Sequence, residues 1–277
     1  GKEVKKKVEL VRNSVKKILC GNPNDHIIFT SSGTESINLA LQGIVRKGDH
    51  VITTVIEHKA VLETCKFLES QGVKVTYLPV QKDGLVRVDD IAKAITKKTK
   101  LISIHYVNNE IGTVQPIQKI GVISRKHGVL FHTDACQAGL LQLDVNKLHV
   151  DLLTMNGSKI SGPKGMGILY ANNSVNLSPI IYGGGQEFGL KSGTENVPGI
   201  IGFAKALELI QSEKEKEREL ERLRSLKDFF VQELTNLVGG VKVNGHPTKN
   251  APHILNVTFE GVEAEILLQY LDQESIF

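Results

Sequence analysis

Residues 150–165, Val-Asp-Leu-Leu-Thr-Met-Asn-Gly-Ser-Lys-Ile-Ser-Gly-Pro-Lys-Gly, contain the most informative pattern in the sequence. The apolar run to Met155 predicts a buried strand, and the small polar residues after it place Lys159 at the carboxyl end of that strand. A lysine held there beside glycine and serine donors suits a Schiff-base site for pyridoxal phosphate. Taken alone, the pattern also fits a solvated lysine in a turn between two strands.

A carboxylate ends a second apolar segment. The run that begins at Val129 reaches Asp134, which is also expected at the end of a strand. A carboxylate in that place can pair with a protonated pyridine nitrogen and keep the ring an electron sink, whereas the alternative role is to cap a helix. Gln137 follows one helical turn later and can reach the same ring.

Residues 29–36, Phe-Thr-Ser-Ser-Gly-Thr-Glu-Ser, lead from a short predicted strand into an amphipathic helix. Small residues at a helix start leave backbone N–H groups and hydroxyls free to face an anion. The segment therefore predicts a phosphate cup of a different design from a P-loop. The sequence has no Gly-x-x-x-x-Gly-Lys-Ser/Thr and no Gly-x-Gly-x-x-Gly after a strand, which disfavours a dinucleotide site.

Composition limits the class of protein. With 277 residues, of which 40% are apolar, the chain can bury a sizeable core, so we expect one large domain and a smaller piece. No apolar run approaches the roughly 18 residues that a membrane span needs, so we expect a soluble protein. Three cysteines without paired spacing argue against a disulfide framework and for a reducing compartment.

The charge pattern does not favour nucleic acid. The net charge is +4, and the lysines of residues 2–17 are interleaved with apolar residues at helical spacing, which predicts a solvated helix face. No cleavable signal and no Arg/Ser-rich presequence is visible, so we expect a cytoplasmic protein. Because the sequence opens at Gly1, an organelle stays open as the alternative.

Strand and helix patterns alternate along the first two thirds of the chain, which predicts an α/β fold with a mostly parallel sheet. Expected strands are 27–29, 50–54, 74–78, 101–106, 129–133, 152–155 and 167–170, with helices at 35–45, 59–70, 88–95 and 117–126. A long-helical pattern over 199–237 precedes expected strands at 241–243 and 254–259 and a helix at 264–271. We expect a large domain over residues 1–207 and a small, partial α+β domain over 208–277.

Several short motifs stand in an order that one enzyme family shares. They are residues 57–61 (Glu-His-Lys-Ala-Val), 108–112 (Asn-Asn-Glu-Ile-Gly), 132–134 (His-Thr-Asp), 157–159 (Gly-Ser-Lys), 183–187 (Gly-Gly-Gly-Gln-Glu) and 192–194 (Ser-Gly-Thr). On these motifs the chain resembles the pyridoxal-phosphate cysteine desulfurases of the class V aminotransferase superfamily, from about residue 28 to the end. The resemblance implies a fold-type I transferase with a mostly parallel seven-stranded sheet, helices on both faces and a small, incomplete C-terminal domain.

The resemblance also implies roles for single residues. Lys159 matches the Schiff-base lysine, with Lys164 as the rival inside the following turn. Asp134 is expected on the pyridinium nitrogen and His58 over the ring face, so Lys159 and His58 are the expected catalytic residues. Asn109 is expected on the ring oxygen or the substrate carboxylate, and Gln137 near the ring oxygen. The residues expected near the phosphate are Gly33, Thr34, Asn156, Ser158 and Thr194.

Two of these positions depart from the family's pattern. Ser158 stands where many relatives carry histidine, and Lys191 replaces an arginine in the segment before Thr194. Serine still offers a hydroxyl, and lysine keeps the charge but loses the bidentate geometry. In the family this segment reaches the phosphate of the neighbouring subunit, so the resemblance implies a homodimer.

The resemblance implies conversion of L-cysteine to L-alanine, with the sulfur passed as a persulfide to acceptors in iron–sulfur cluster assembly or thiolation. The family's sulfur-carrying cysteine and substrate-carboxylate arginine would lie beyond Phe277, so we expect a fragment that is inactive in sulfur transfer. We expect no metal, no direct nucleic-acid partner and no membrane. Alternatives are a selenocysteine lyase, an aminotransferase or a non-catalytic dimeric scaffold.

Overall fold

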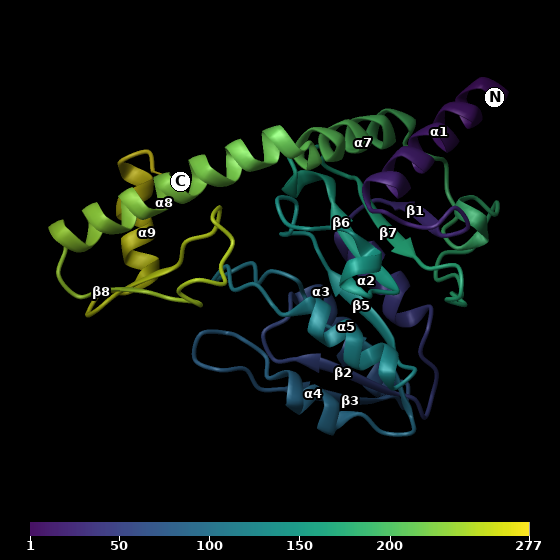
Figure 1. The fold of residues 1–277 in the computed structure, drawn as a ribbon, viewed down its shortest axis with the longest axis horizontal. Coiled ribbons are helices and arrows are strands. Elements are labelled where there is room, and N and C mark those ends of the chain that lie inside the picture. Colours follow the sequence, from purple (N-terminus) through teal and green to yellow (C-terminus); the bar gives the residue numbers. More distant parts are fainter. Residues whose placement is uncertain (277) are drawn as a thin grey trace.

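A seven-stranded sheet forms the centre of the protein in a computed structural model, which describes residues 1–276 (Figure 1). The strands are β1 (His26–Thr30), β2 (His50–Thr54), β3 (Lys74–Leu78), β4 (Thr99–Ser103), β5 (Leu130–Asp134), β6 (Leu152–Asn156) and β7 (Gly167–Ala171). They lie in the order β1-β7-β6-β5-β4-β2-β3. Only β7 runs antiparallel to its neighbours within these strands, so the prediction of a mostly parallel seven-stranded sheet is confirmed.

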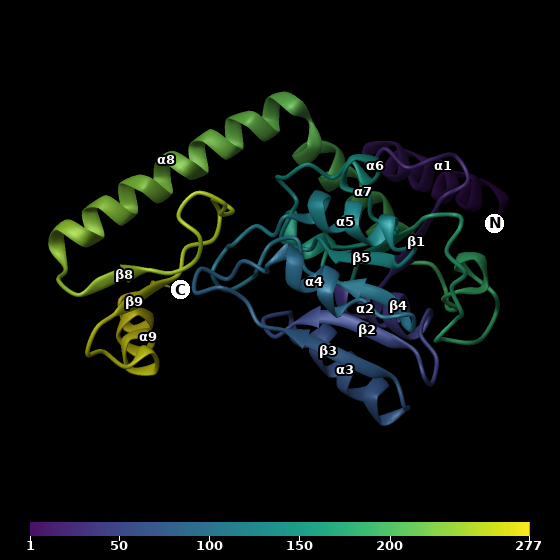
Figure 2. The same ribbon diagram turned by 60° about the horizontal axis from the view of Figure 1, so that its bottom comes forward.

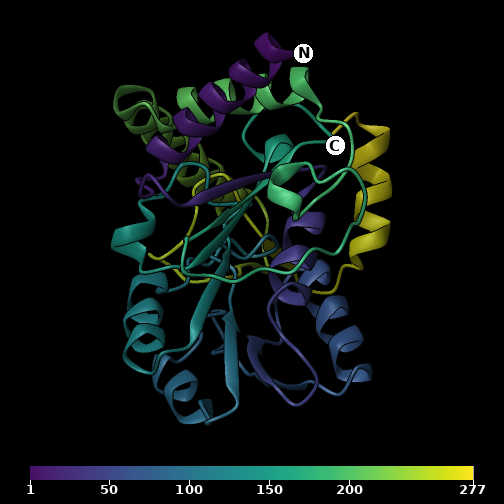
Figure 3. The ribbon, with the colours of Figure 1, turned by 90° about the vertical axis from the view of Figure 1, so that its right-hand side faces the viewer.

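Helices cover both faces of this sheet, as a parallel sheet requires. They are α1 (Lys2–Ile18), α2 (Gly33–Gln42), α3 (Lys59–Ser70), α4 (Val88–Ala94), α5 (Ile117–Lys126), α6 (Val145–Leu148) and α7 (Val197–Gln211). One apolar core lies under α1, α4, α5 and α7, and a second lies under α2 and α3. Figure 3 shows the teal α5 on one side of the sheet and the blue to purple α2 and α3 on the other.

The last part of the described chain forms a smaller α+β unit. A long helix, α8 (Glu213–Leu237), leads to a two-stranded antiparallel sheet of β8 (Val241–Val243) and β9 (Val257–Phe259), and α9 (Ala264–Gln273) follows (Figure 2). Lys227 on α8 donates to the Asn250 side chain and to the carbonyl of Ile254, at 3.0 and 2.7 Å. In the described part of the chain, no helix is both long enough and apolar enough to cross a membrane.

Most predicted boundaries fall within two residues of the observed ones, and two differences have physical causes. The strand expected from Ile254 begins only at Val257, because Ile254 lies in a turn and its carbonyl accepts from Lys227. The strand expected to continue to Tyr106 ends formally at Ser103. The backbone after Ser103 nevertheless remains hydrogen-bonded to β5, since the Tyr106 N–H donates to the carbonyl of Asp134 at 2.8 Å.

A buried ion pair fixes α1 to the sheet edge and to a loop. Arg12, 5% exposed, donates to both carboxylate oxygens of Glu187 at 2.7 and 3.0 Å, and the Phe29 N–H donates to the same carboxylate at 2.8 Å. Glu187 and Phe188 have positive φ angles of 48° and 61°, which are unfavourable for residues with side chains. The ion pair therefore holds a strained turn against β1.

We expect Arg12→Met to lower the free energy of unfolding by roughly 3–5 kcal/mol, because it leaves the buried Glu187 carboxylate without its cation. Lys17→Met, on the exposed face of the same helix, is the control and should change stability by less than about 0.5 kcal/mol. Denaturant unfolding measures both variants. Equal stability of the two variants would contradict the anchoring role of Arg12.

Candidate functional site

The carboxyl ends of the parallel strands surround a cavity of about 180 Å³. Ligands of open α/β sheets bind at this edge. Its walls contain Gly33, Thr34, Ile37, His58, His105, Val107, Asn109, Asp134, Cys136, Gln137, Asn156 and Lys159. Eight of these residues were expected at the site from the sequence, and they come from five different loops. Ser158 and Thr194 are not among the lining residues.

Lys159 is presented by the tight connection between β6 and β7. Gly157 N–H donates to the carbonyl of Met166 at 2.8 Å, which closes this loop, and a short 3-10 turn (Gly157–Lys159) carries the lysine. Only glycine fits at 157, because an added Cβ would lie 2.8 Å from the Pro163 carbonyl oxygen. The rival Lys164 is exposed and is absent from the cavity wall.

Ser158 is turned toward the neighbouring asparagine. Its N–H and its hydroxyl both donate to Asn156 Oδ1 at 3.3 Å. Asn156 itself is part of the cavity wall, so Ser158 braces a lining residue in this structure.

Asp134 is the buried acid of the cavity. The carboxylate is 8% exposed, and one oxygen accepts from the N–H of Cys136 at 3.0 Å. Burial raises the pKa of Asp134, an effect that the Cys136 hydrogen bonds oppose. A buried carboxylate with a free edge facing a cavity suits a cationic N–H on a ligand.

The start of α2 supplies the polar end of the cavity. The Ser32 hydroxyl caps the helix by accepting from the N–H of Glu35 at 3.1 Å, and the earlier N–H groups have no partner within the helix. An added Cβ at Gly33 would lie 2.7 Å from the sulfur of Cys136, so this approach needs glycine. Thr34 is exposed and lines the same cavity, where a hydroxyl is a suitable donor to an anion.

His58 and Asn109 complete the wall on the other side. His58 caps α3, where its Nδ1 accepts from the N–H of Ala60 at 3.0 Å, so a neutral ring carries its proton on Nε2. Asn109 donates from its side-chain amide to Glu110 at 2.8 Å. The buried Asn108 instead fixes the loop, by donating to the carbonyl of Ile56 at 3.0 Å.

Thr194 lies in a separate cavity of about 260 Å³, together with Thr30, Lys191 and Glu187. Its side chain is exposed. Within one chain, therefore, Thr194 does not reach the cavity of Lys159, and its expected role remains a prediction about a second subunit.

Four lining residues were not expected from the sequence, namely Ile37, His105, Val107 and Cys136. Two of them, His105 and Cys136, carry groups that can titrate, and His105 falls inside the strand expected over 101–106. A period-two pattern beginning at Ser103 places His105 on the same sheet face as Ser103, and this alternation could have identified it. The pattern gives no comparable signal for Cys136.

The donor set of this cavity fits pyridoxal phosphate. Free helix N–H groups and hydroxyls suit its phosphate, a buried carboxylate suits its ring nitrogen, and a lysine suits its aldehyde. A metal ion fits less well, because no group of acids, histidines and cysteines with metal-ligand spacing occurs in the described residues.

A larger cavity of about 610 Å³ adjoins this one and shares Gln137 and Lys159 with it. Its other walls come from apolar residues of α7, from α8, which contributes Glu215, Arg218, Glu219 and Leu223, and from the Lys159 loop. It therefore provides open space beside the lysine, and charged side chains line its α8 side.

Known proteins resemble the whole chain. A family model described as Aminotransferase class-V matches residues 1–277. "Cysteine desulfurase IscS" of Dictyoglomus turgidum is 44% identical over 281 aligned positions, which cover 100% of this chain and 71% of that protein. The protein of the same name from Methanosarcina thermophila is 46% identical, with 100% and 69% covered.

Solved structures agree in both fold and sequence. A structure titled "NIFS-LIKE PROTEIN" superposes with a TM-score of 0.94 at 39% identity and covers 100% of this chain and 76% of that chain. DndA from Streptomyces lividans has a TM-score of 0.88 at 34% identity, with 99% and 78% covered.

The three thiols should differ sharply in reactivity. Cys20 is exposed, burial raises the pKa of Cys65 to about 12, and burial next to Asp134 raises that of Cys136. With a disulfide reagent at pH 8, we expect one fast thiol, Cys20, and two that react about 100-fold more slowly until the protein unfolds. Cys20→Ser should remove the fast phase. A fast phase that survives in this variant would show that Cys65 or Cys136 is an accessible nucleophile.

Proposed function

The chain belongs to the class-V aminotransferase family and, within it, to the cysteine desulfurases, and on this premise we propose that it acts on L-cysteine with pyridoxal phosphate as cofactor. The products would be L-alanine and sulfur, which passes as a persulfide to an acceptor protein such as an iron–sulfur scaffold. The observation that carries this assignment is that Lys159 and Asp134, from two different strand ends, line one cavity that the rival Lys164 does not reach.

The cofactor, when bound, supplies an electron sink next to the substrate's α-carbon. Asp134 would hold the proton of the ring nitrogen and so keep this sink effective. Lys159 would attach the cofactor, give way to the substrate amine, and then move the proton at Cα. His58, which caps α3 and has its Nε2 free, would stack on the ring and exclude water from its face.

The phosphate would lie at the start of α2. Gly33 and Thr34 offer backbone N–H groups and a hydroxyl there, while Asn156, braced by Ser158, closes the same side. Asn109 and Gln137 remain for the ring oxygen and the substrate carboxylate. The chain would divide into a large cofactor-binding domain (1–207) and a small domain (208–277).

The protein would work as a homodimer in which Thr194 and Lys191 of one subunit complete the phosphate site of the other. Support comes from the position of Thr194, which is exposed and outside the cavity of its own chain. We further propose a reducing compartment, the cytoplasm, because the described structure leaves Cys20 as an exposed free thiol. One relative is named for an organelle, as "Cysteine desulfurase, mitosomal" of Encephalitozoon cuniculi.

Borohydride reduction of the cofactor-loaded protein should fix the cofactor to Lys159, and peptide mass spectrometry would identify the site. Lys159→Ala should abolish this covalent adduct and the visible absorbance of the bound cofactor. Lys164→Ala is the matched control, five residues away in the same loop, and should leave both intact. An adduct on Lys164 in the wild-type protein would overturn the assignment.

The loss of one hydrogen bond to the phosphate dianion should weaken cofactor binding in Thr194→Val by roughly 10- to 150-fold, equivalent to about 1.5–3 kcal/mol. The decisive test mixes this variant with Lys159→Ala and isolates the heterodimer. If Thr194 acts across the interface, one of the two sites is fully intact and binds cofactor at wild-type affinity. If both sites of the heterodimer bind weakly, Thr194 acts within its own chain.

A further inference from the structure

His105 lies beside Asp134 on the same face of the sheet. β4 and β5 pair in parallel with Ser103 opposite His132, and the side chains of these two residues are hydrogen-bonded at 2.8 Å. The ladder continues beyond them, because Tyr106 N–H donates to the Asp134 carbonyl. Two residues further along both strands, this register sets His105 opposite Asp134. Both residues line the same cavity.

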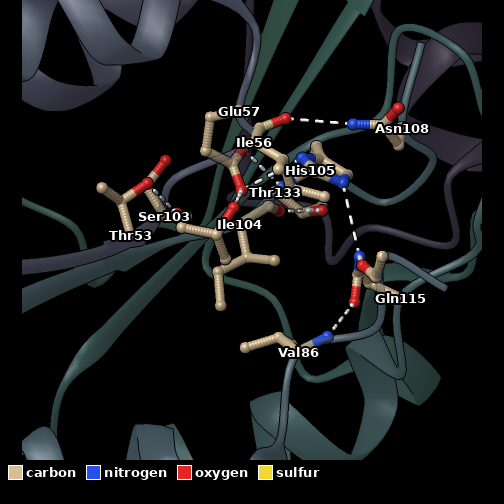
Figure 4. A network of polar contacts seen from close by, with 12 residues as sticks. Thr53, Ile56, Glu57, Val86, Ser103, Ile104, His105, Asn108, Gln115 and Thr133 are labelled. Carbon is tan, nitrogen blue, oxygen red and sulfur yellow. Dashed lines mark hydrogen bonds and ion pairs between the residues drawn. The ribbon is translucent and has the colours of Figure 1, made fainter. Parts of the chain in front are cut away.

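On its other side, His105 faces Glu57. The His105 Nδ1 lies 3.0 Å from Glu57 Oε1, and the backbone N–H of His105 donates to Glu57 Oε2 at 2.8 Å. The Thr54 hydroxyl donates to Oε1 at 2.7 Å, which fixes the carboxylate in this position. Figure 4 shows His105 between Glu57 and Gln115.

The remaining neighbours are uncharged or exposed. Burial lowers the pKa of His132, on the same sheet face, to about 3, so this ring is neutral at neutral pH. The Gln115 amide lies 3.5 Å from His105 Nε2, but it is directed elsewhere: it donates to the Gly84 carbonyl at 2.7 Å and accepts from the Val86 N–H at 3.0 Å. The Cys136 thiol faces Asp134, and burial raises its pKa well above the usual range, so it adds no charge at neutral pH. Lys159 is exposed at the rim of the cavity.

Two carboxylates and one imidazole therefore share a nearly dry space. Glu57 is 5% exposed, His105 3% and Asp134 8%. If His105 were neutral, two anions would be buried side by side, which costs several kcal/mol. Burial lowers the pKa of His105, but the Glu57 carboxylate and Asp134 together outweigh burial, so the pKa of His105 is raised. In turn, burial and Glu57 raise the pKa of Asp134, and the Cys136 hydrogen bonds and His105 oppose part of this rise.

We propose that His105, held as an imidazolium by Glu57, is a positioning residue that keeps Asp134 negatively charged and thereby able to hold the proton of the cofactor's ring nitrogen. Glu57 alone would repel the charge of Asp134, and the pair of Glu57 with His105 cancels that repulsion. This role rests on the proposed function for the identity of the ligand, whereas the charge of His105 is a property of the free protein.

The first experiment measures that charge directly, in the wild-type protein without cofactor. Nuclear magnetic resonance of protein labelled with ¹⁵N-histidine, with His105→Gln used to assign the signal, should show both ring nitrogens of His105 protonated at pH 7.5. The exposed His127 serves as the reference signal. A neutral tautomer of His105 at pH 7.5 would overturn the proposal, whatever the protein does with cofactor.

The second experiment follows cofactor retention between pH 5.5 and 8.5, measured from the bound absorbance after gel filtration. Without the imidazolium, Asp134 becomes harder to ionise. The midpoint pH below which His105→Gln loses cofactor should therefore rise by about 1–2 units. The double variant Glu57→Gln/His105→Gln removes both charges and should return to within about 0.5 units of the wild type.

His127→Gln is the matched control and should keep the wild-type midpoint. An unchanged midpoint in His105→Gln, or a double variant no better than the single one, would contradict the proposal. Thermal melts of the cofactor-free variants separate this effect from misfolding, because a general loss of structure would not be repaired by a second substitution. If the wild-type protein took up no pyridoxal phosphate at all, the proposed function would fail, while the charge measured on His105 would still stand.

Discussion

The reversed direction of β7 is the constraint on which the site depends. Because β7 runs antiparallel between β6 and β1, the chain must turn back immediately after β6, and the resulting tight loop carries Lys159. The same strand sets the end of β1 next to that loop. An added Cβ on Gly167 would lie 2.6 Å from the backbone of Ser32, so the start of α2 is held within contact of the β6–β7 hairpin. A lysine and a helix start with free N–H groups are thereby fixed at one sheet edge.

The sequence allowed much of this to be predicted, because the signals are local. Apolar runs that end in small or charged residues locate strand ends, and parallel strands place those ends along one edge. On this basis Asp134 and Lys159 were predicted to lie at one sheet edge, and both line the same cavity. The local pattern could not reveal the partnership of Glu57 with His105, because their contact depends on which strands are neighbours and on the pairing register. Nor could it place Thr194, whose surroundings within one chain differ from those expected across an interface.

Two buried ion pairs show how this protein uses charge in its interior. Arg12 with Glu187 joins an N-terminal helix to a strained turn, and Glu57 with His105 joins two strand ends. In neither case are the partners close in sequence, so each pair forms only when distant segments have docked correctly. Such pairs add little net stability relative to apolar packing, but they penalise any arrangement that separates the two charges. Their main effect is therefore to favour the native docking of these segments over alternative arrangements.

The small α+β unit is joined to the site through a segment that hydrogen-bonds to the loop after Asn109. Lys227 links α8 to residues 250–254, and the backbone of that segment pairs with the loop that follows Asn109: the Val114 N–H donates to the Lys249 carbonyl, and the Ala251 N–H to the Gly112 carbonyl. The helix has 25 residues and no buried residue along its length. α8 is therefore tied to the loop that carries Asn109 through the segment at residues 249–254, and not through a buried face of its own.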